Sequence, residues 1–145
     1  MVKILVKKLD SSVKLPSYKT EGSSGMDLMA LTNKSIKILP QKSYLVPTGI
    51  SVAIPKNYEI QVRPRSGLAA KNNISVLNTP GTIDSDYRGE LKVILFNHGS
   101  DEFLINNGDR IAQIVLMPIH KIDFEEVDQL PETIRGEGGF GSTGK

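Results

Sequence analysis

The chain has 145 residues, a formal net charge of +2 and no cysteine. This length suits one domain with a single hydrophobic core. The missing cysteine excludes disulfides, thiol nucleophiles and thiolate-bound zinc, and two histidines are too few for a histidine-rich metal site. Lysines and arginines are scattered, so we expect no direct nucleic-acid binding. The apolar runs are too short for a signal peptide or a membrane span, so we expect no membrane association and a soluble, cytosolic protein.

Strand patterns run through almost the whole chain. Residues 35–38 and 58–63 alternate apolar and polar side chains, which is typical of half-buried strands. Residues 91–96 and 111–117 are richer in Val, Ile and Leu and are predicted to be buried strands. Turn signals containing Pro, Gly and Asn recur roughly every eight to twelve residues. This spacing predicts an all-β sandwich or barrel.

The segment Gly25-Met26-Asp27-Leu28 places one carboxylate among apolar neighbours. A buried, isolated carboxylate is costly, so Asp27 is expected to have a partner. The partner is a backbone cap, an arginine or the water shell of a magnesium ion. Taken alone, the segment favours the cap.

The segment PRSGLA, residues 64–69, directly follows a predicted strand. The Arg65 guanidinium, the Ser66 hydroxyl and the N–H groups of a helix start together outline an anion site. A simple helix cap is the alternative. We predict a short helix over residues 67–71 with Ser66 as its cap.

The segment Gly81 to Glu90, GTIDSDYRGE, is the richest in functional groups. It holds Asp84, Asp86, Tyr87 and Arg88 within five positions. A turn needs the glycines and one Asp, but it does not need a Tyr between an acid and an Arg. A site for a small polar ligand with a ring uses all of these groups.

The segment Gly108 to Gln113 is predicted to be a turn that opens a strand. Because side chains alternate along a strand, Arg110 and Gln113 are expected on opposite faces. An amide on a core strand needs partners, and Gln113 is either structural or ligand-binding.

The C-terminal segment 135–145, RGEGGFGSTGK, is nearly half glycine and cannot bury enough surface to order itself. For an arbitrary protein this predicts a disordered tail. Its glycines match parts of two phosphate-loop patterns, but both need a following helix, and we predict none. Backbone N–H groups, an Arg and hydroxyls remain, which can wrap a phosphate that other groups hold.

In their order along the chain, these segments resemble the five motifs of the homotrimeric dUTPase family. The motifs are SGMDL, PRSGLA, NTPGTIDSDYRGE, GDRIAQ and RGEGGFGSTG. The one departure is Ser24, where Ala is commoner. The resemblance implies an all-β, jelly-roll-type sandwich with one short helix and a flexible, glycine-rich C-terminal tail. It also implies a β-sandwich domain over residues 1–130 and a tail over 131–145 that closes over a neighbouring subunit's active site.

The activity that the resemblance implies is hydrolysis of dUTP to dUMP and pyrophosphate. This activity limits uracil incorporation into DNA and supplies dUMP for thymidylate synthesis. Asp84 would orient and deprotonate the water that attacks the α-phosphorus. Tyr87 would pack against deoxyribose, and Asn78 would read the uracil edge.

The remaining implied roles concern the phosphate chain, the metal and the assembly. The expected contacts to substrate are Arg65, Ser66, Gly67 and Gln113, joined from the tail by Arg135, Gly141 and Ser142, with Phe140 over the uracil. A Mg²⁺ ion would be held mainly by substrate phosphates and touched by Asp27 through water. Three subunits would share each active site. Asp86, Arg88 and Arg110 are interpreted as mainly structural.

Two other functions stay open at this point. A related dCTP deaminase of the same fold resembles this chain around Thr82-Ile83-Asp84, but Ser85-Asp86-Tyr87 and the glycine-rich tail favour the phosphohydrolase. A nucleotide-sensing regulator that binds dUTP and signals to a partner protein is the second alternative. The intact candidate catalytic positions argue against a protein that only binds.

Overall fold

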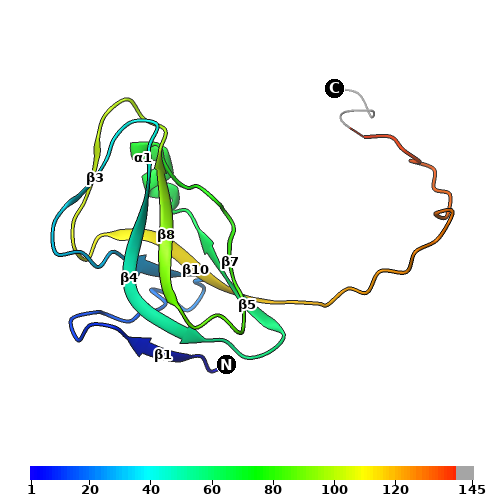
Figure 1. Ribbon diagram of the computed structural model, residues 1–145, viewed down its shortest axis with the longest axis horizontal. Coiled ribbons are helices and arrows are strands. Elements are labelled where there is room, and N and C mark those ends of the chain that lie inside the picture. Colours follow the sequence, from blue (N-terminus) through cyan, green and yellow to red (C-terminus); the bar gives the residue numbers. More distant parts are fainter. Residues whose placement is uncertain (140–145) are drawn as a thin grey trace.

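The computed structural model describes residues 1–139 and is built from strands with one short helix, as predicted (Figure 1). Every strand pairing is antiparallel. The elements are β1 (Leu5–Lys8), β2 (Met26–Met29), β3 (Ile36–Ile38), β4 (Ser43–Ala53), β5 (Tyr58–Arg63), α1 (Ser66–Asn72), β6 (Ile74–Val76), β7 (Gly81–Ile83), β8 (Glu90–Asn97), β9 (Phe103–Ile105) and β10 (Arg110–Pro118).

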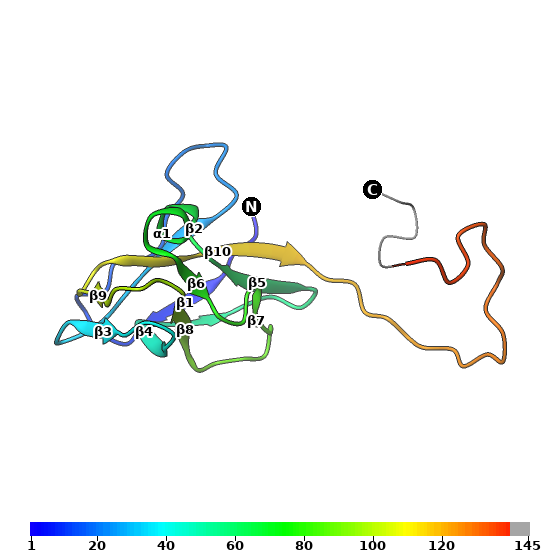
Figure 2. The ribbon, with the colours of Figure 1, turned by 90° about the horizontal axis from the view of Figure 1, so that it is seen from above.

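The strands form two four-stranded sheets and one two-stranded sheet. One large sheet has the order β1-β4-β8-β6 and the other β2-β10-β5-β7, while β3 pairs with β9. Figure 2 shows the two large sheets as stacked layers, with β10 and β5 in one and β4 and β8 in the other. Side chains between the layers form the core, which explains why alternating sequence patterns predict these strands well.

Strand β8 buries one face only, which corrects the prediction of a fully buried strand. Leu91, Val93 and Leu95 point into the core, whereas Lys92 is exposed and Ile94 is half-buried. The apolar residues at alternate positions build the core, and the other side of β8 is left to line a surface cavity. Strand β10 likewise has half-buried positions from Val115 to Met117.

The helix α1 begins one residue earlier than predicted, at Ser66, and Ser66 does not cap it. Arg65 occupies the cap position with extended backbone, and its side chain makes no capping hydrogen bond. Its carbonyl accepts the first helical bond from the Ala69 N–H at 3.0 Å. The Ser66 side chain is exposed and does not cap the helix. Asn73 ends the helix in the left-handed conformation, with φ of 55°.

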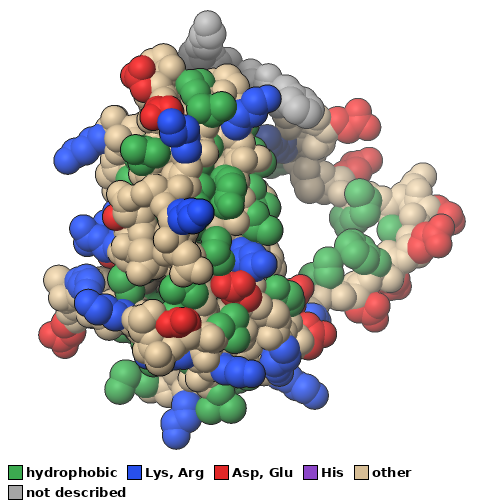
Figure 3. All heavy atoms as spheres, turned by 60° about the vertical axis from the view of Figure 1, so that its left-hand side comes forward, with side chains coloured by type: hydrophobic (Ala, Val, Ile, Leu, Met, Phe, Trp, Pro, Cys, Tyr) green, Lys and Arg blue, Asp and Glu red, His purple; other side chains and the backbone are tan. Residues whose placement is uncertain are grey.

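The chain leaves the sandwich after Pro118. Residues 119–139 contain no helix or strand, so regular structure ends well before residue 130. Figure 3 shows acidic and apolar side chains following one another along this segment as it stands away from the domain. Among residues 1–139 no helix is long and apolar enough to cross a membrane.

One buried amide ties three segments of the fold together. Asn97 is 1% exposed, at the end of β8. Its side-chain nitrogen donates to the Ile38 carbonyl at 3.0 Å and to the Asp101 carbonyl at 2.8 Å. Its side-chain oxygen accepts the Gly99 N–H at 2.9 Å. The amide thus satisfies backbone groups of β3 and of the turn after β8, which no apolar side chain can do.

We expect Asn97→Ala to destabilise the protein by about 2–4 kcal/mol, because it leaves a buried carbonyl and an N–H without partners. Urea denaturation monitored by circular dichroism measures the change. Asn33→Ala, at an exposed turn, is the matched control and should change stability by less than about 0.5 kcal/mol. Equal effects of both variants would contradict a special role for the Asn97 amide.

Candidate active site

The turn between β7 and β8 is held by hydrogen bonds within the segment that carries Asp84 and Tyr87. The Tyr87 N–H donates to the Asp84 carbonyl at 3.2 Å. The Arg88 guanidinium donates to the carbonyls of Ser85 and Tyr87 at 2.7 and 2.8 Å. Arg88 therefore stabilises the turn, as its predicted structural role requires. The turn fixes the carboxylate and the ring relative to each other.

The Tyr87 ring lies against Gly89. Its hydroxyl donates to the Glu90 carbonyl at 3.1 Å. A Cβ atom at Gly89 would come within 2.3 Å of the Tyr87 hydroxyl oxygen. A side chain at position 89 would therefore displace the Tyr87 ring from the place where its hydroxyl meets the Glu90 carbonyl.

A surface cavity of about 430 Å³ opens beside this turn. It brings together three predicted site residues, Asn78, Asp84 and Tyr87. Its other lining residues are Leu45, Thr82, Ile83, Glu90, Lys92 and Ile94. Sequence reasoning missed the contributions of β4 and β8. Once β8 is known to bury Leu91 and Val93, alternation places Glu90 and Lys92 on the cavity side.

A second cluster of predicted residues centres on Asp27 in β2. Arg65 donates through Nε to Asp27 Oδ1 at 2.9 Å, and Arg110 through Nη1 to Oδ2 at 3.4 Å. The Asp27 and Arg65 side chains are 19% and 24% exposed. Of the partners considered for Asp27, the structure contains the arginine, and it contains two of them. Each carboxylate oxygen has a guanidinium partner.

Gln113 and Arg110 lie on the same side of β10, contrary to prediction. Gln113 is directly opposite Asp27 in the sheet, and Arg110 reaches the same carboxylate. The cause is a register shift between Arg110 and Ala112, which puts both Ile111 and Ala112 into the core. The Gln113 amide donates to the Pro64 carbonyl at 2.9 Å. It thereby positions the residue before Arg65.

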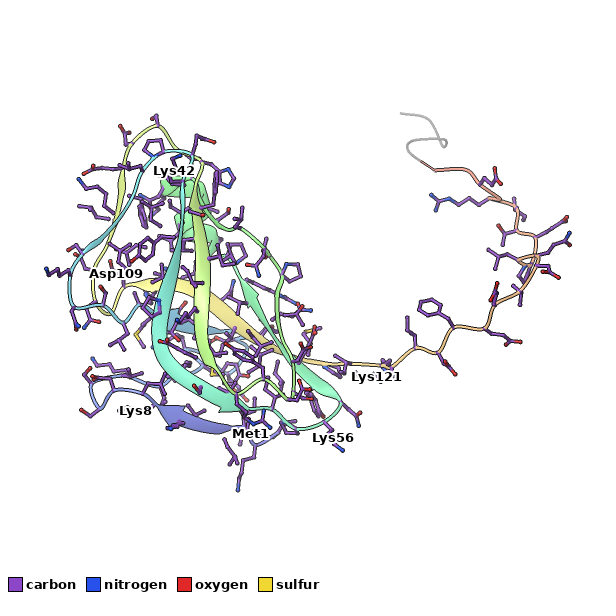
Figure 4. All side chains as sticks on the ribbon, viewed as in Figure 1. Met1, Lys8, Lys42, Lys56, Asp109 and Lys121 are labelled. Atoms are coloured by element: carbon purple, nitrogen blue, oxygen red, sulfur yellow. The ribbon has the colours of Figure 1, made fainter. Side chains whose placement is uncertain are left out.

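Strand β5 separates the two clusters. Ile83 pairs with Ile60, so Asp84 comes next to Glu59 near the start of β5, whereas Arg65 follows its end. Six residues of extended chain between positions 59 and 65 span about 20 Å. In Figure 4, Lys56, just before β5, is labelled at the bottom of the molecule, and α1 lies at the top. Ser66 and Gly67 belong to the α1 end.

Of the predicted tail residues, the structure describes only Arg135, which is exposed and donates through Nε to the Gly138 carbonyl at 2.7 Å. Phe140, Gly141 and Ser142 lie outside the described residues. Among residues 1–139 no three acidic or histidine side chains converge on a possible metal position.

The dUTPase family model matches residues 11–144, nearly the whole chain. The chain belongs to the dUTPase family. A deoxyuridine 5'-triphosphate nucleotidohydrolase of Fusobacterium nucleatum is 56% identical over the full length of both chains. One from Rickettsia bellii is 54% identical, covering 99% of this chain and 97% of the relative.

Solved dUTPase structures share the fold. The dUTPase of Staphylococcus bacteriophage 80alpha, a glycine-to-serine variant solved with dUpNHpp, has a TM-score of 0.88 at 24% identity and covers 99% of each chain. That of phage phi11 has a TM-score of 0.80 at 21% identity, over 90% of this chain and 99% of the other. The predicted family, its enzyme class (dUTP diphosphatase) and the all-β, jelly-roll-type fold are confirmed.

We expect Asp27→Asn to destabilise the dUTPase by about 1–2 kcal/mol without added metal, because two guanidinium groups lose a partly buried counter-charge. Thermal and urea unfolding in EDTA measure the effect. Glu102→Gln is the matched control, since it breaks the more exposed pair with Lys37 and should cost less than about 0.5 kcal/mol. Full stability of Asp27→Asn in EDTA would show that the arginines do not depend on this carboxylate.

Proposed function

We propose that this dUTPase hydrolyses dUTP to dUMP and pyrophosphate, with a water molecule attacking the α-phosphorus. The observation that carries the proposal is the single cavity that Asn78, Asp84 and Tyr87 line together. These side chains offer a hydrogen-bonding amide, a carboxylate and an aromatic face, which suit a base, a water or sugar hydroxyl, and a sugar ring respectively.

Asp84 is the proposed general base. It orients the water and takes its proton, and it bonds the sugar 3′-hydroxyl. A carboxylate is a weak base near neutral pH, so its placement contributes more than its proton affinity. The bond between the Tyr87 N–H and the Asp84 carbonyl supports such placement, since it fixes the backbone on which the carboxylate sits.

Tyr87 and Asn78 are the proposed specificity groups. The Tyr87 ring packs against deoxyribose and leaves no room for a 2′-hydroxyl. Asn78 and neighbouring backbone groups bond the uracil edge, and the tight hairpin rejects the 5-methyl group of thymine by steric clash. The Asn78 amide stands next to Gly81, where an added Cβ would meet its nitrogen at 3.3 Å.

We propose that the active site is completed by other subunits of a homotrimer. Asp84 must face the α-phosphorus, and the β- and γ-phosphates follow it through only two bridging oxygens. Arg65 of the same chain is about 20 Å away along β5, too far to contact that nucleotide. Arg65, Ser66, Gly67 and Gln113 therefore serve a nucleotide held by a neighbouring subunit's cavity.

The cofactor of the proposal is Mg²⁺. No cage of three metal-ligating side chains exists among residues 1–139, and the Asp27 carboxylate keeps lone pairs beyond its two arginine bonds. Both facts fit a hydrated ion held mainly by phosphates, with Asp27 contacting its water shell. Such an ion offsets negative charge on the pyrophosphate leaving group. The phage phi11 relative is described with a structural Mg(II) ion.

The C-terminal tail is the third proposed component of the active site. In the proposed division, residues 1–130 form the sandwich domain and residues 131–145 close over a neighbour's site. Arg135, Gly141 and Ser142 hold the outer phosphates, and Phe140 covers the uracil. The lack of helix or strand from residue 119 to residue 139 supports a segment that takes its conformation from a partner. The proposed setting is the cytosol, where the enzyme limits dUTP and supplies dUMP.

Phosphorus NMR with dUTP, dCTP, dTTP and UTP, each with Mg²⁺, tests the function, and only dUTP should give pyrophosphate. Under the same conditions Asp84→Asn should bind nucleotide normally and lose turnover by a factor of roughly a hundred or more, since it removes the positioned base. Asp86→Asn, in the same turn, is the matched control for loss of charge. Intact dUTP with the unaltered enzyme would refute the function, and near-normal turnover of Asp84→Asn would remove Asp84 from the mechanism.

Subunit mixing tests the shared site. Chains lacking residues 135–145 should still fold and assemble but should lose most activity, because the tail contributes to the site and not to the core. Mixing them with Asp84→Asn chains should restore part of the activity, because some sites then have one intact copy of each component. Native mass spectrometry checks subunit exchange. An inactive mixture despite proven exchange would argue against sites built from several chains.

A further inference from the structure

The outer face of strand β5 carries a continuous row of polar side chains. Ile60 and Val62 are buried in the core, so Glu59, Gln61 and Arg63 lie on the opposite face, where each is half-buried. The Arg63 guanidinium donates to the Gln61 side-chain oxygen through Nε at 3.0 Å and through Nη2 at 2.6 Å. The Gln61 side-chain nitrogen donates to Glu59 Oε1 at 2.7 Å. One row of hydrogen bonds therefore runs along β5 from a positive end to a negative end.

Neither charge of this row is neutralised within the described part of the chain. None of the ion pairs among residues 1–139 includes Arg63 or Glu59. Both charged side chains bond the neutral Gln61, and Arg63 otherwise contacts the Met117 sulfur at 3.7 Å. A charged group that has lost part of its water is stabilised best by a partner of opposite charge. The row thus offers a cation and an anion to another molecule.

The two ends of the row lie beside the two parts of the proposed shared site. Arg63 is directly opposite Gln113 in the sheet and two residues before Arg65, so it adjoins the proposed phosphate end. Glu59 lines a surface cavity of about 220 Å³ together with Asp84, so it adjoins the proposed base. In the proposed trimer the phosphate end of one subunit meets the Asp84 end of the next. The Arg63 end of one row then approaches the Glu59 end of the next row.

We propose that Arg63 forms an ion pair with Glu59 of the neighbouring subunit at each boundary of the trimer. This inference rests on the proposed sharing of the active site between subunits. Each subunit gives its positive end to one neighbour and receives the other neighbour at its negative end. A head-to-tail contact of this kind closes a ring. The outer face of β5 is therefore an interaction surface for further copies of the same chain.

Charge reversal tests whether the two charges meet across a subunit boundary. Arg63→Glu puts two carboxylates at each boundary, and Glu59→Arg puts two cations there. Either change should weaken the trimer by about tenfold or more per boundary, as expected for close charge pairs at interfaces. Sedimentation equilibrium over a dilution series measures the dissociation constant, and circular dichroism checks that each chain is folded. Glu102→Arg, which reverses an exposed charge paired with Lys37 of its own chain, is the matched control and should leave assembly unchanged within about twofold.

Mixing the two reversed chains separates a contact between subunits from a contact within one chain. A boundary between unlike chains restores opposite charges, whereas a boundary between like chains keeps the repulsion. A ring of three that contains both chains has two boundaries of the first kind and one of the second. The mixture should therefore assemble more tightly than either chain alone but less tightly than the unaltered protein. Native mass spectrometry should show mixed trimers in excess of the random proportion.

Four results would overturn the inference. Reversed chains that both assemble as the unaltered protein does would show that neither charge lies at a boundary. A mixture no tighter than its components would show that Arg63 and Glu59 do not face each other. Where a reversed chain fails to fold, Arg63→Gln and Glu59→Gln replace it, and additive losses in their double variant would exclude the pair. A protein that stays monomeric would refute the shared site as well, whereas the first three results leave that site and dUTP hydrolysis standing.

Discussion

Strand β5 sets the geometry on which the active site depends. It pairs with β7 on one side and with β10 on the other, so its length and register are fixed by both neighbours. Asp84 is held at one end, and Arg65 leaves from the other. A paired strand cannot shorten, and therefore no side-chain motion within one chain brings these groups to the same phosphate chain. The proposed sharing of the active site between subunits therefore rests on a backbone constraint rather than on a surface feature.

The same separation along β5 places different charged side chains at the two ends of the strand. The β7–β8 end holds Asp84, the proposed general base, together with a second acid, Glu90. The α1 end holds Arg65 and Arg110 around Asp27. Strand β5 keeps Asp84, the proposed base, away from Arg65 and Arg110 of its own chain, which therefore cannot form an ion pair with it. In the proposed trimer, Arg65 and Arg110 come close to Asp84 only across a subunit boundary, where a nucleotide would lie between them.

The sequence predicts local features well because their causes are local. Alternation along residues 58–63 gives β5 with the observed bounds, and the crowded segment around Asp84 and Tyr87 does form one turn. Features that depend on pairing between distant strands were missed. The contact of Asp27 with Arg110 needs the register shift in β10. Such a shift cannot be recognised from the alternation of apolar and polar residues along a strand. The role of Asn97 likewise depends on which carbonyls the fold leaves unpaired nearby, and a lone Asn at a strand end does not reveal that.

The two ends of the site are stabilised by different interactions, so they should respond differently to ionic strength. Around Asp84 the turn is held by hydrogen bonds to backbone carbonyls and by the close fit of Tyr87 on Gly89, neither of which depends strongly on salt. Around Asp27 the arrangement depends on ion pairs with Arg65 and Arg110, the second of which is half exposed and open to screening. Raising the ionic strength should therefore loosen the cluster around Asp27, the proposed phosphate end, before it disturbs the turn around Asp84, the proposed nucleoside end. Affinity for the triphosphate then falls with salt more steeply than affinity for deoxyuridine, although the same fold presents both ends.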